Sequence, residues 1–317
     1  MKSLTCFLLF SLCPLLRAQT TLATEPVKKM VVFLYAAAAD GSADKRHPLG
    51  TGFLIFSPLK TTPNMMGKES NATGELFLIT ARHIFDPAWA YCSGSQPDLV
   101  YMRVNTKNYD PTKDMTGVEY LPVHLVRNGI KQYFVRDDDD KVDAAVVDVG
   151  LEFQQGKYDA VPMRISVFAS SEEIKRLQIG DSVASAGLLP GKSGERRNYP
   201  FFKFGEISNV PDESTWMSCE KGMPELRLES AWFIAASLVG GNSGSPIFYV
   251  PLPMCLPGSG MTCTRGLNRG AVIGVQSSSF DGADVAGMTP IEDVFKIIEQ
   301  HSLLGVDLYR GDETNRK

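Results

Sequence analysis

The sequence has no long basic run and no marked excess of charge of one sign. Its 317 residues include 32 lysines and arginines and 36 aspartates and glutamates, so the formal net charge is −4. A nucleic-acid-binding surface is therefore not expected. Charged residues make up only 21% of the chain and hydrophobic residues 44%, which excludes a disordered chain, a collagen-like chain and one that crosses a membrane many times. A soluble globular protein remains, long enough for one large domain or two smaller units.

Patterns that bind metals are also missing. The chain has 4 histidines, and His47, His124 and His301 are scattered without the spacing of metal ligands. No two cysteines are separated by two residues, the spacing typical of zinc sites. The sequence thus implies no metal and no cofactor.

A strongly apolar run lies at the N-terminus. Lys2 supplies a positive start, and residues 4–16 are mostly apolar. This pattern predicts a secretory signal peptide over residues 1–18, cleaved after Ala18, and hence a secreted or periplasmic product. A membrane anchor needs about 20 apolar residues, more than this run provides, so no membrane span is expected. A lipoprotein anchor at Cys13 is the less favoured alternative.

Cysteine usage agrees with export. An even number of cysteines follows the signal, which favours disulfides in an oxidising compartment and leaves three connectivities open. Cys255 and Cys263 flank a loop rich in proline and glycine, so a bridge between them is the natural pairing, with Cys92 and Cys219 left to pair with each other. A zinc site is the alternative, and it is disfavoured because no histidine lies close to these cysteines.

Short apolar or alternating segments, separated by turn residues, fill most of the chain. Such a pattern predicts an all-β barrel or sandwich. The predicted strands include Met30–Ala37, Gly52–Phe56, Leu76–Thr80, Leu99–Val104, Ala144–Val149, Asp181–Ala186 and Ala271–Gln276. One long helix is predicted, after Pro290, where an apolar stripe runs through Gln300.

Three polar residues stand out at the ends of predicted strands. His83 follows an apolar strand, Asp143 precedes another, and Ser243 lies in a glycine-rich turn, in the order histidine, aspartate, serine. Serine is too weak an acid to attack a carbonyl without a base, histidine titrates near neutrality, and a carboxylate fixes the imidazole tautomer. A tight turn here can also aim the backbone N–H groups of Gly241 and Ser243 at one point, as an oxyanion hole requires. The sequence therefore predicts a catalytic triad.

The motifs around these residues resemble those of trypsin-like (chymotrypsin-fold) serine peptidases, in particular the bacterial exported, Deg/HtrA-like protease domains. They cover most of the mature chain in the family's order. They are Gly50-Thr51-Gly52-Phe53, Thr80-Ala81-Arg82-His83, Asp143-Ala144-Ala145-Val146, Ser185-Ala186-Gly187, Gly205-Glu206-Ile207-Ser208, Gly241-Asn242-Ser243-Gly244-Ser245-Pro246 and Val272-Ile273-Gly274-Val275.

The resemblance implies two antiparallel six-stranded β-barrels with a cleft between them. The first barrel is expected over residues 27–155 and the second over residues 156–290, followed by a C-terminal helix over 291–301 and a tail over 302–317. A peptide-binding PDZ domain of the HtrA type is not expected after the last helix.

Departures from the family's pattern are informative. Asn242 stands where zymogen-activated members carry an aspartate that pairs with a new N-terminal ammonium group, so activation by N-terminal insertion is not expected. By resemblance, Ser237 occupies the floor of the specificity pocket, and Gln276, Ser277 and Ser278 its wall. No carboxylate is present there, so the resemblance does not support a preference for arginine or lysine.

These observations predict an exported serine endopeptidase that acts on a peptide or protein substrate through an acyl-enzyme intermediate. Two alternatives stay open. One is a catalytically silent pseudopeptidase that binds peptides or a partner, and the other is an esterase that uses the same triad.

Overall fold

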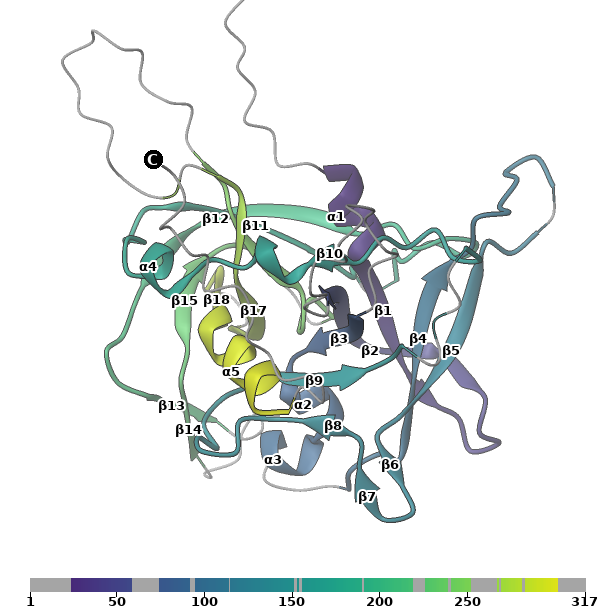
Figure 1. The fold of residues 1–317 in the computed structure, drawn as a ribbon, viewed down its shortest axis with the longest axis horizontal. Coiled ribbons are helices and arrows are strands. Elements are labelled where there is room, and N and C mark those ends of the chain that lie inside the picture. The colour runs from purple at the N-terminus through teal and green to yellow at the C-terminus, as the bar shows by residue number, and fades with distance from the viewer. Residues whose placement is uncertain are drawn as a thin grey trace, which may run out of the picture.

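The computed structural model confirms the predicted all-β class with a C-terminal helix (Figure 1). The predicted signal peptide, the four cysteines that follow it and the predicted tail lie outside the residues that the structure describes. Those residues are 24–58, 74–91, 95–113, 115–150, 153, 156–189, 191–218, 226–238, 241–251, 267, 269–280 and 283–301. No helix within these ranges is both long enough and apolar enough to cross a membrane.

The first half of the chain forms an 8-stranded sheet. Its strands follow the order β5-β4-β1-β2-β3-β9-β8, and β10 pairs with β2 in parallel while the other neighbours are antiparallel. The bounds are β1 Val31–Ala37, β2 Ala43–Pro58, β3 Gly74–Thr80, β4 Leu99–Asn105, β5 Val118–His124, β8 Tyr133–Phe134, β9 Ala145–Asp148 and β10 Met163–Arg164. A small hairpin, β6 Val126–Arg127 and β7 Ile130–Lys131, lies beside it. This unit thus differs in strand number from the expected six.

The second half forms a closed barrel of six strands in the order β11-β12-β15-β18-β17-β16, as expected. Their bounds are β11 Ser182–Gly187, β12 Phe201–Asn209, β15 Trp232–Ala235, β16 Pro246–Tyr249, β17 Ala271–Phe280 and β18 Val285–Pro290. A hairpin of β13 (Thr215–Ser218) and β14 (Leu226–Glu229) pairs with neither sheet (Figure 1).

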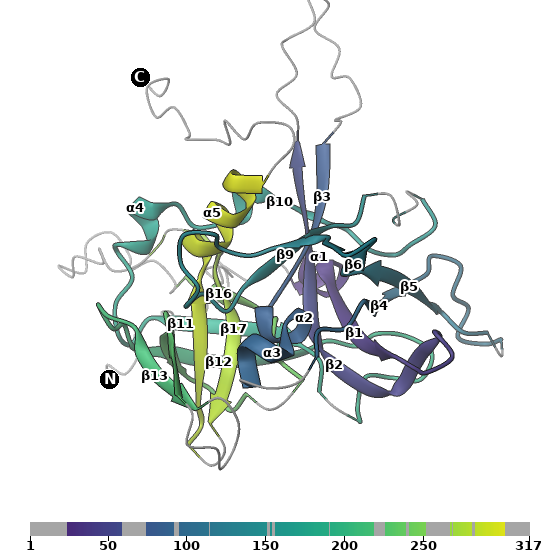
Figure 2. The ribbon, with the colours of Figure 1, turned by 90° about the horizontal axis from the view of Figure 1, so that it is seen from below.

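Helices are few and mostly short. They are α1 Thr24–Met30, α2 Arg82–Phe85, α3 Pro87–Tyr91, the 3-10 helix Ile165–Val167, α4 Ser171–Ile174 and α5 Ile291–His301. α5 is the predicted C-terminal helix, and it buries Ile291, Val294, Ile297 and Ile298, the stripe that the sequence indicated. It lies beside β17, β18 and β9, so it contacts both halves (Figure 2).

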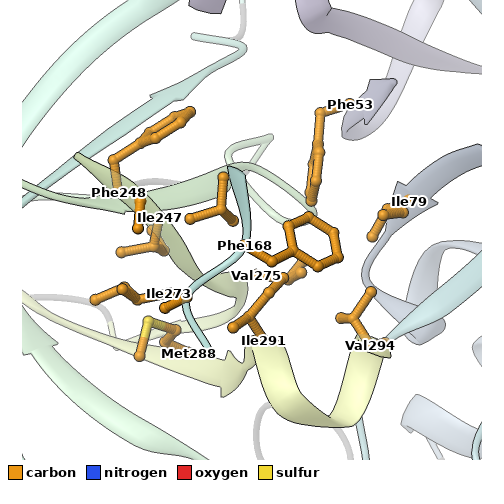
Figure 3. Packing of buried hydrophobic residues seen from close by; sticks show 14 of the residues in the cluster. Phe53, Ile79, Phe168, Ile247, Phe248, Ile273, Val275, Met288, Ile291 and Val294 are labelled. Carbon is orange, nitrogen blue, oxygen red and sulfur yellow. The ribbon is translucent and has the colours of Figure 1, made fainter. Parts of the chain in front are cut away.

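One hydrophobic core joins the two halves. Figure 3 shows Phe168 between Phe53 and Ile79 of the first sheet and Ile291 and Val294 of α5, all of them buried. A second core lies on the other face of the first sheet.

Successive residues of a strand face opposite sides of a sheet, so the central strands contribute to both cores. In β2, for example, Phe53 belongs to the shared core and Leu54 to the second core. Burial on both faces explains why these strands have continuous apolar sequences. The shared core fixes the two sheets relative to each other, and therefore also the loops that they carry.

Candidate active site

Strand pairing brings His83 and Asp143 together. β3 and β9 are antiparallel neighbours, and Thr80, the last residue of β3, faces Ala145, the first of β9. His83 comes shortly after β3 ends, and Asp143 shortly before β9 begins. Both residues therefore emerge at the same end of this strand pair.

Asp143 holds His83 at two points. Its Oδ2 lies 2.8 Å from the imidazole Nδ1, and its Oδ1 accepts the backbone N–H of His83 at 3.0 Å. α2 starts after Ala81, whose side chain cannot cap a helix, so Asp143 satisfies an N–H group that a local cap would otherwise satisfy. The Asp143 side chain is 0% exposed and that of His83 13% exposed. The carboxylate is thus fully enclosed, while part of the imidazole stays accessible.

The surroundings of His83 favour its protonated form. Burial acts against the charged imidazolium, but the Asp143 carboxylate and its hydrogen bond outweigh this effect and raise the pKa of His83 above its ordinary value. Glu229 adds to the increase, and Arg227 opposes it. An imidazole in this setting accepts a proton readily, as a general base must.

Thr51 fixes the turn that carries Ser243. Its N–H donates to the Ser243 carbonyl at 2.8 Å, and its Oγ1 donates to the Gly241 carbonyl at 2.8 Å. The same Oγ1 accepts the Leu188 N–H at 2.9 Å, and the Thr51 carbonyl accepts the Thr80 hydroxyl at 2.7 Å. Thr51 is fully buried. One residue of β2 therefore ties the serine turn to β3 and to the end of β11.

Gly244 lets the serine turn approach β2 and β3 closely. Its φ is +83°, and a Cβ at this position would lie 2.0 Å from the Thr51 carbonyl oxygen and 2.2 Å from Thr80 Oγ1. Both the backbone conformation and the available space exclude a side chain here. Packing between the two halves of the molecule thus requires glycine at position 244.

A second close approach places the serine turn beside the histidine helix. A Cβ on Gly50 would lie 2.6 Å from Ile84 Cδ1 and 2.8 Å from the Ser243 carbonyl oxygen. Ile84 directly follows His83 in α2. Gly50 therefore lies between the residue after His83 and Ser243, and it keeps the two segments near each other.

Asn242 anchors the same turn through its side chain. It is buried, and its Nδ2 donates to the Leu188 carbonyl at 2.8 Å, while its own carbonyl accepts the Ser245 N–H at 2.8 Å. A carboxylate cannot donate to a carbonyl, so the amide gives this turn an anchor that an aspartate could not supply. The Asn242 substitution that the resemblance singled out is therefore built into the packing of the turn.

The two predicted oxyanion donors lie in this turn. The carbonyls of Gly241 and Ser243 both accept hydrogen bonds from Thr51. Within the part of the chain that the structure describes, neither of their N–H groups donates to a backbone carbonyl.

The predicted pocket residues fall into two groups. Ser237 is exposed, and its carbonyl accepts a hydrogen bond from Lys203 Nζ, a contact that the sequence did not indicate. Gln276 and Ser277 are buried on β17, and Gln276 Nε2 donates to the Ser278 carbonyl at 2.8 Å. Among the described residues, Gln276 Oε1 and the Ser278 hydroxyl are buried without a hydrogen-bond partner. The Ser277 hydroxyl lies near Glu229 and favours the ionised form of its carboxylate.

Sequence analysis missed a charged pair next to His83 and Asp143. Glu229, at the end of β14, is fully buried, and its Oε2 accepts a hydrogen bond from Arg227 Nη2 at 2.8 Å. Both residues lie in an ordinary alternating strand, so no local motif indicates them. The roles of Thr51 and Thr80 were also missed, although both belong to motifs that the sequence displayed.

Among the described residues, no group of three or more histidine, cysteine, aspartate or glutamate side chains is arranged to hold a metal ion. A cavity of about 480 Å³ lies against β11, β12 and β15 and contains none of His83, Asp143 and Ser243.

No protein family model and no curated protein matches the chain. Among solved structures, it is similar to the apo form of the MamO protease domain from Magnetospirillum magneticum, with 12% identity over 86% of this chain and 96% of that chain and a TM-score of 0.46. It is also similar to the active form of the Rv3671c protease from M. tuberculosis, with 17% identity over 87% of this chain and 82% of that chain and a TM-score of 0.45. The inactive form of that protease gives 16% identity over 86% and 89% of the two chains and a TM-score of 0.42.

Proposed function

We propose that the protein is an exported serine endopeptidase that hydrolyses peptide bonds through Ser243, His83 and Asp143. The observation that carries the proposal is the packing of three segments. Asp143 holds His83 by two hydrogen bonds, and the Ser243 turn is anchored on Thr51 beside the same helix. Export is supported by the apolar N-terminal run of residues 1–18.

In this mechanism, His83 Nε2 takes the hydroxyl proton of Ser243 because Nδ1 is already bound to Asp143. The Ser243 oxygen attacks the peptide carbonyl, and the tetrahedral oxyanion accepts hydrogen bonds from the N–H groups of Gly241 and Ser243. His83 then donates its proton to the amine nitrogen as the C–N bond breaks, which leaves the acyl-enzyme. Water attacks the acyl-enzyme while His83 accepts its proton, and His83 passes this proton to the Ser243 oxygen as the acyl C–O bond breaks and the acid product leaves.

Substrate preference is proposed to depend on Ser237, Gln276, Ser277 and Ser278. The unpaired polar atoms of Gln276 and Ser278 support a polar group in the substrate, because an apolar side chain would leave them unpaired. A peptide library with one varied position on the acyl side of the scissile bond tests this expectation.

The test of the proposed function is labelling with a fluorophosphonate probe, with the modified residue located by mass spectrometry. We expect label on Ser243 of the parent protein and none on Ser243→Ala. Ser245→Ala is the matched control, because Ser245 is a buried neighbour whose hydroxyl has no partner in the described part of the chain. It should label like the parent.

Each alternative predicts a different outcome. A folded parent protein that takes no label would indicate the pseudopeptidase. Label on Ser243 with turnover of small esters but not of peptides would indicate the esterase.

A further inference from the structure

The β13–β14 hairpin belongs to neither sheet and ends near the candidate site. Its last residue, Glu229, is followed by Ser230, whose N–H donates to the Lys141 carbonyl at 3.0 Å. Lys141 is two positions before Asp143. The hairpin from the second half of the chain is therefore fastened to the segment of the first half that carries the catalytic aspartate of the proposed mechanism.

Arg227 fastens the hairpin to the helices near His83 as well. Its Nη1 donates to the Ala90 carbonyl of α3 at 2.6 Å, and its guanidinium lies 4.5 Å from the centre of the Trp89 ring. Arg82, the residue before His83, lies 4.5 Å from the same ring. Trp89 thus contacts two arginines, one from each half of the molecule, and this contact fixes the position of Arg227.

Glu229 is a second enclosed carboxylate in this region. Its side chain is 0% exposed, and that of Arg227 is 16% exposed. Oε2 is bound to Arg227, and the Ser277 hydroxyl is a second neighbour that favours the ionised carboxylate. Burial of a carboxylate costs stability even when the group is paired, so the presence of Glu229 here points to a role other than stabilising the fold.

Burial and the charged neighbours of Glu229 together determine its pKa. Burial raises the pKa of Glu229 to about 7, and the negative charge of Asp143 acts in the same direction. Arg227, the Ser277 hydroxyl and His83 oppose this increase. Because the interaction between two titrating groups is mutual, ionised Glu229 must also favour the protonated form of His83.

We propose that Glu229, held by Arg227, is a positioning residue that stabilises the His83 imidazolium together with Asp143. This inference rests on the proposed peptidase function only for its catalytic consequence. When His83 accepts the serine proton, a positive charge appears beside two buried carboxylates and one guanidinium. Glu229 offsets the unfavourable field of Arg227, and Arg227 keeps Glu229 in place.

The test is the titration of the His83 imidazole by NMR, which does not depend on turnover. In Glu229→Gln, we expect the midpoint for His83 to fall by about one pH unit, as removal of a nearby opposite charge predicts. The matched control is Glu119→Gln. Glu119 also pairs with a cation, with 2.8 Å between its Oε1 and Lys157 Nζ, but it lies on β5. This control should leave the midpoint unchanged.

An unchanged midpoint in Glu229→Gln, or an equal decrease in Glu119→Gln, would overturn the proposal.

If Glu229→Gln does not fold, carboxyl ¹³C NMR of the parent protein tests the proposal instead. Glu229 should then show an inflection near neutral pH and a second one that coincides with the titration of His83. Absence of a change in the Glu229 signal that coincides with the titration of His83 would overturn the proposal. Absence of label on Ser243, together with the expected His83 shift, would refute the peptidase function and leave the positioning role intact.

Discussion

Replacement of Asp143 by asparagine changes the chemistry of the site while preserving its shape. The backbone N–H of His83 donates to Asp143 Oδ1 at 3.0 Å, so the side-chain amide of Asp143→Asn must keep its oxygen on that side. Its NH₂ group then faces Nδ1, which lies 2.8 Å from Oδ2 in the parent protein. Nδ1 must accept this hydrogen bond, and the ring proton moves to Nε2. The nitrogen that should accept the serine proton becomes a donor.

The expected loss is large. A wrong imidazole tautomer of this kind lowers kcat about 10⁴-fold in a well-studied serine protease triad. At 1.36 kcal/mol for each tenfold change, this corresponds to about 5 kcal/mol of activation free energy. The assay is the rate of fluorophosphonate labelling at Ser243, supported by peptide hydrolysis and by circular dichroism as a check of folding.

Asp140→Asn is the matched control for this prediction. Asp140 also contacts a cation of the same helix, with 2.6 Å between its Oδ1 and Arg82 Nη1, but its side chain is 81% exposed. Because the Asp140 carboxylate is exposed to solvent, its pairing with Arg82 contributes little, so labelling should stay close to the parent rate. If Asp143→Asn labels nearly as fast as Asp140→Asn, the tautomer argument is wrong.

Three further predictions concern the elements that support the site. Thr51→Val leaves the Leu188 N–H without its acceptor and should lower the free energy of unfolding by about 1–3 kcal/mol in urea titrations, whereas Thr51→Ser should match the parent. Gly244→Ala puts a Cβ 2.2 Å from Thr80 Oγ1 on a residue whose φ is +83°. Labelling of Ser243 should therefore be lost along with stability, and a variant that labels normally would contradict the packing argument. Because burial raises the pKa of Glu229 from 4.5 to about 7, its contribution to stability is present below pH 4.5 and is lost as the pH rises to 7. Glu229→Gln removes this loss, so its Tm relative to the parent should increase between pH 4.5 and 7, and a constant difference would refute the assignment.

The sequence by itself determined the secondary structure in the apolar segments and the order of the candidate triad. β1, β3 and α5 follow directly from apolar runs or stripes, because burial of these side chains dominates local preference. His83, Asp143 and Ser243 were recognisable because each lies next to such a strand, in a motif of small residues. Their roles stay a prediction, as do the export signal, the disulfides and the domain boundaries.

Only the tertiary structure decided which residues surround the triad. Asp143 meets His83 because β3 pairs with β9, and Thr51 reaches Ser243 because a shared core joins the two sheets. Glu229 comes to the site through a hairpin that belongs to neither sheet. Such contacts join residues far apart in the chain, and their energy depends on burial and distance. A local sequence pattern carries neither quantity, so these partners become visible only when the chain is folded.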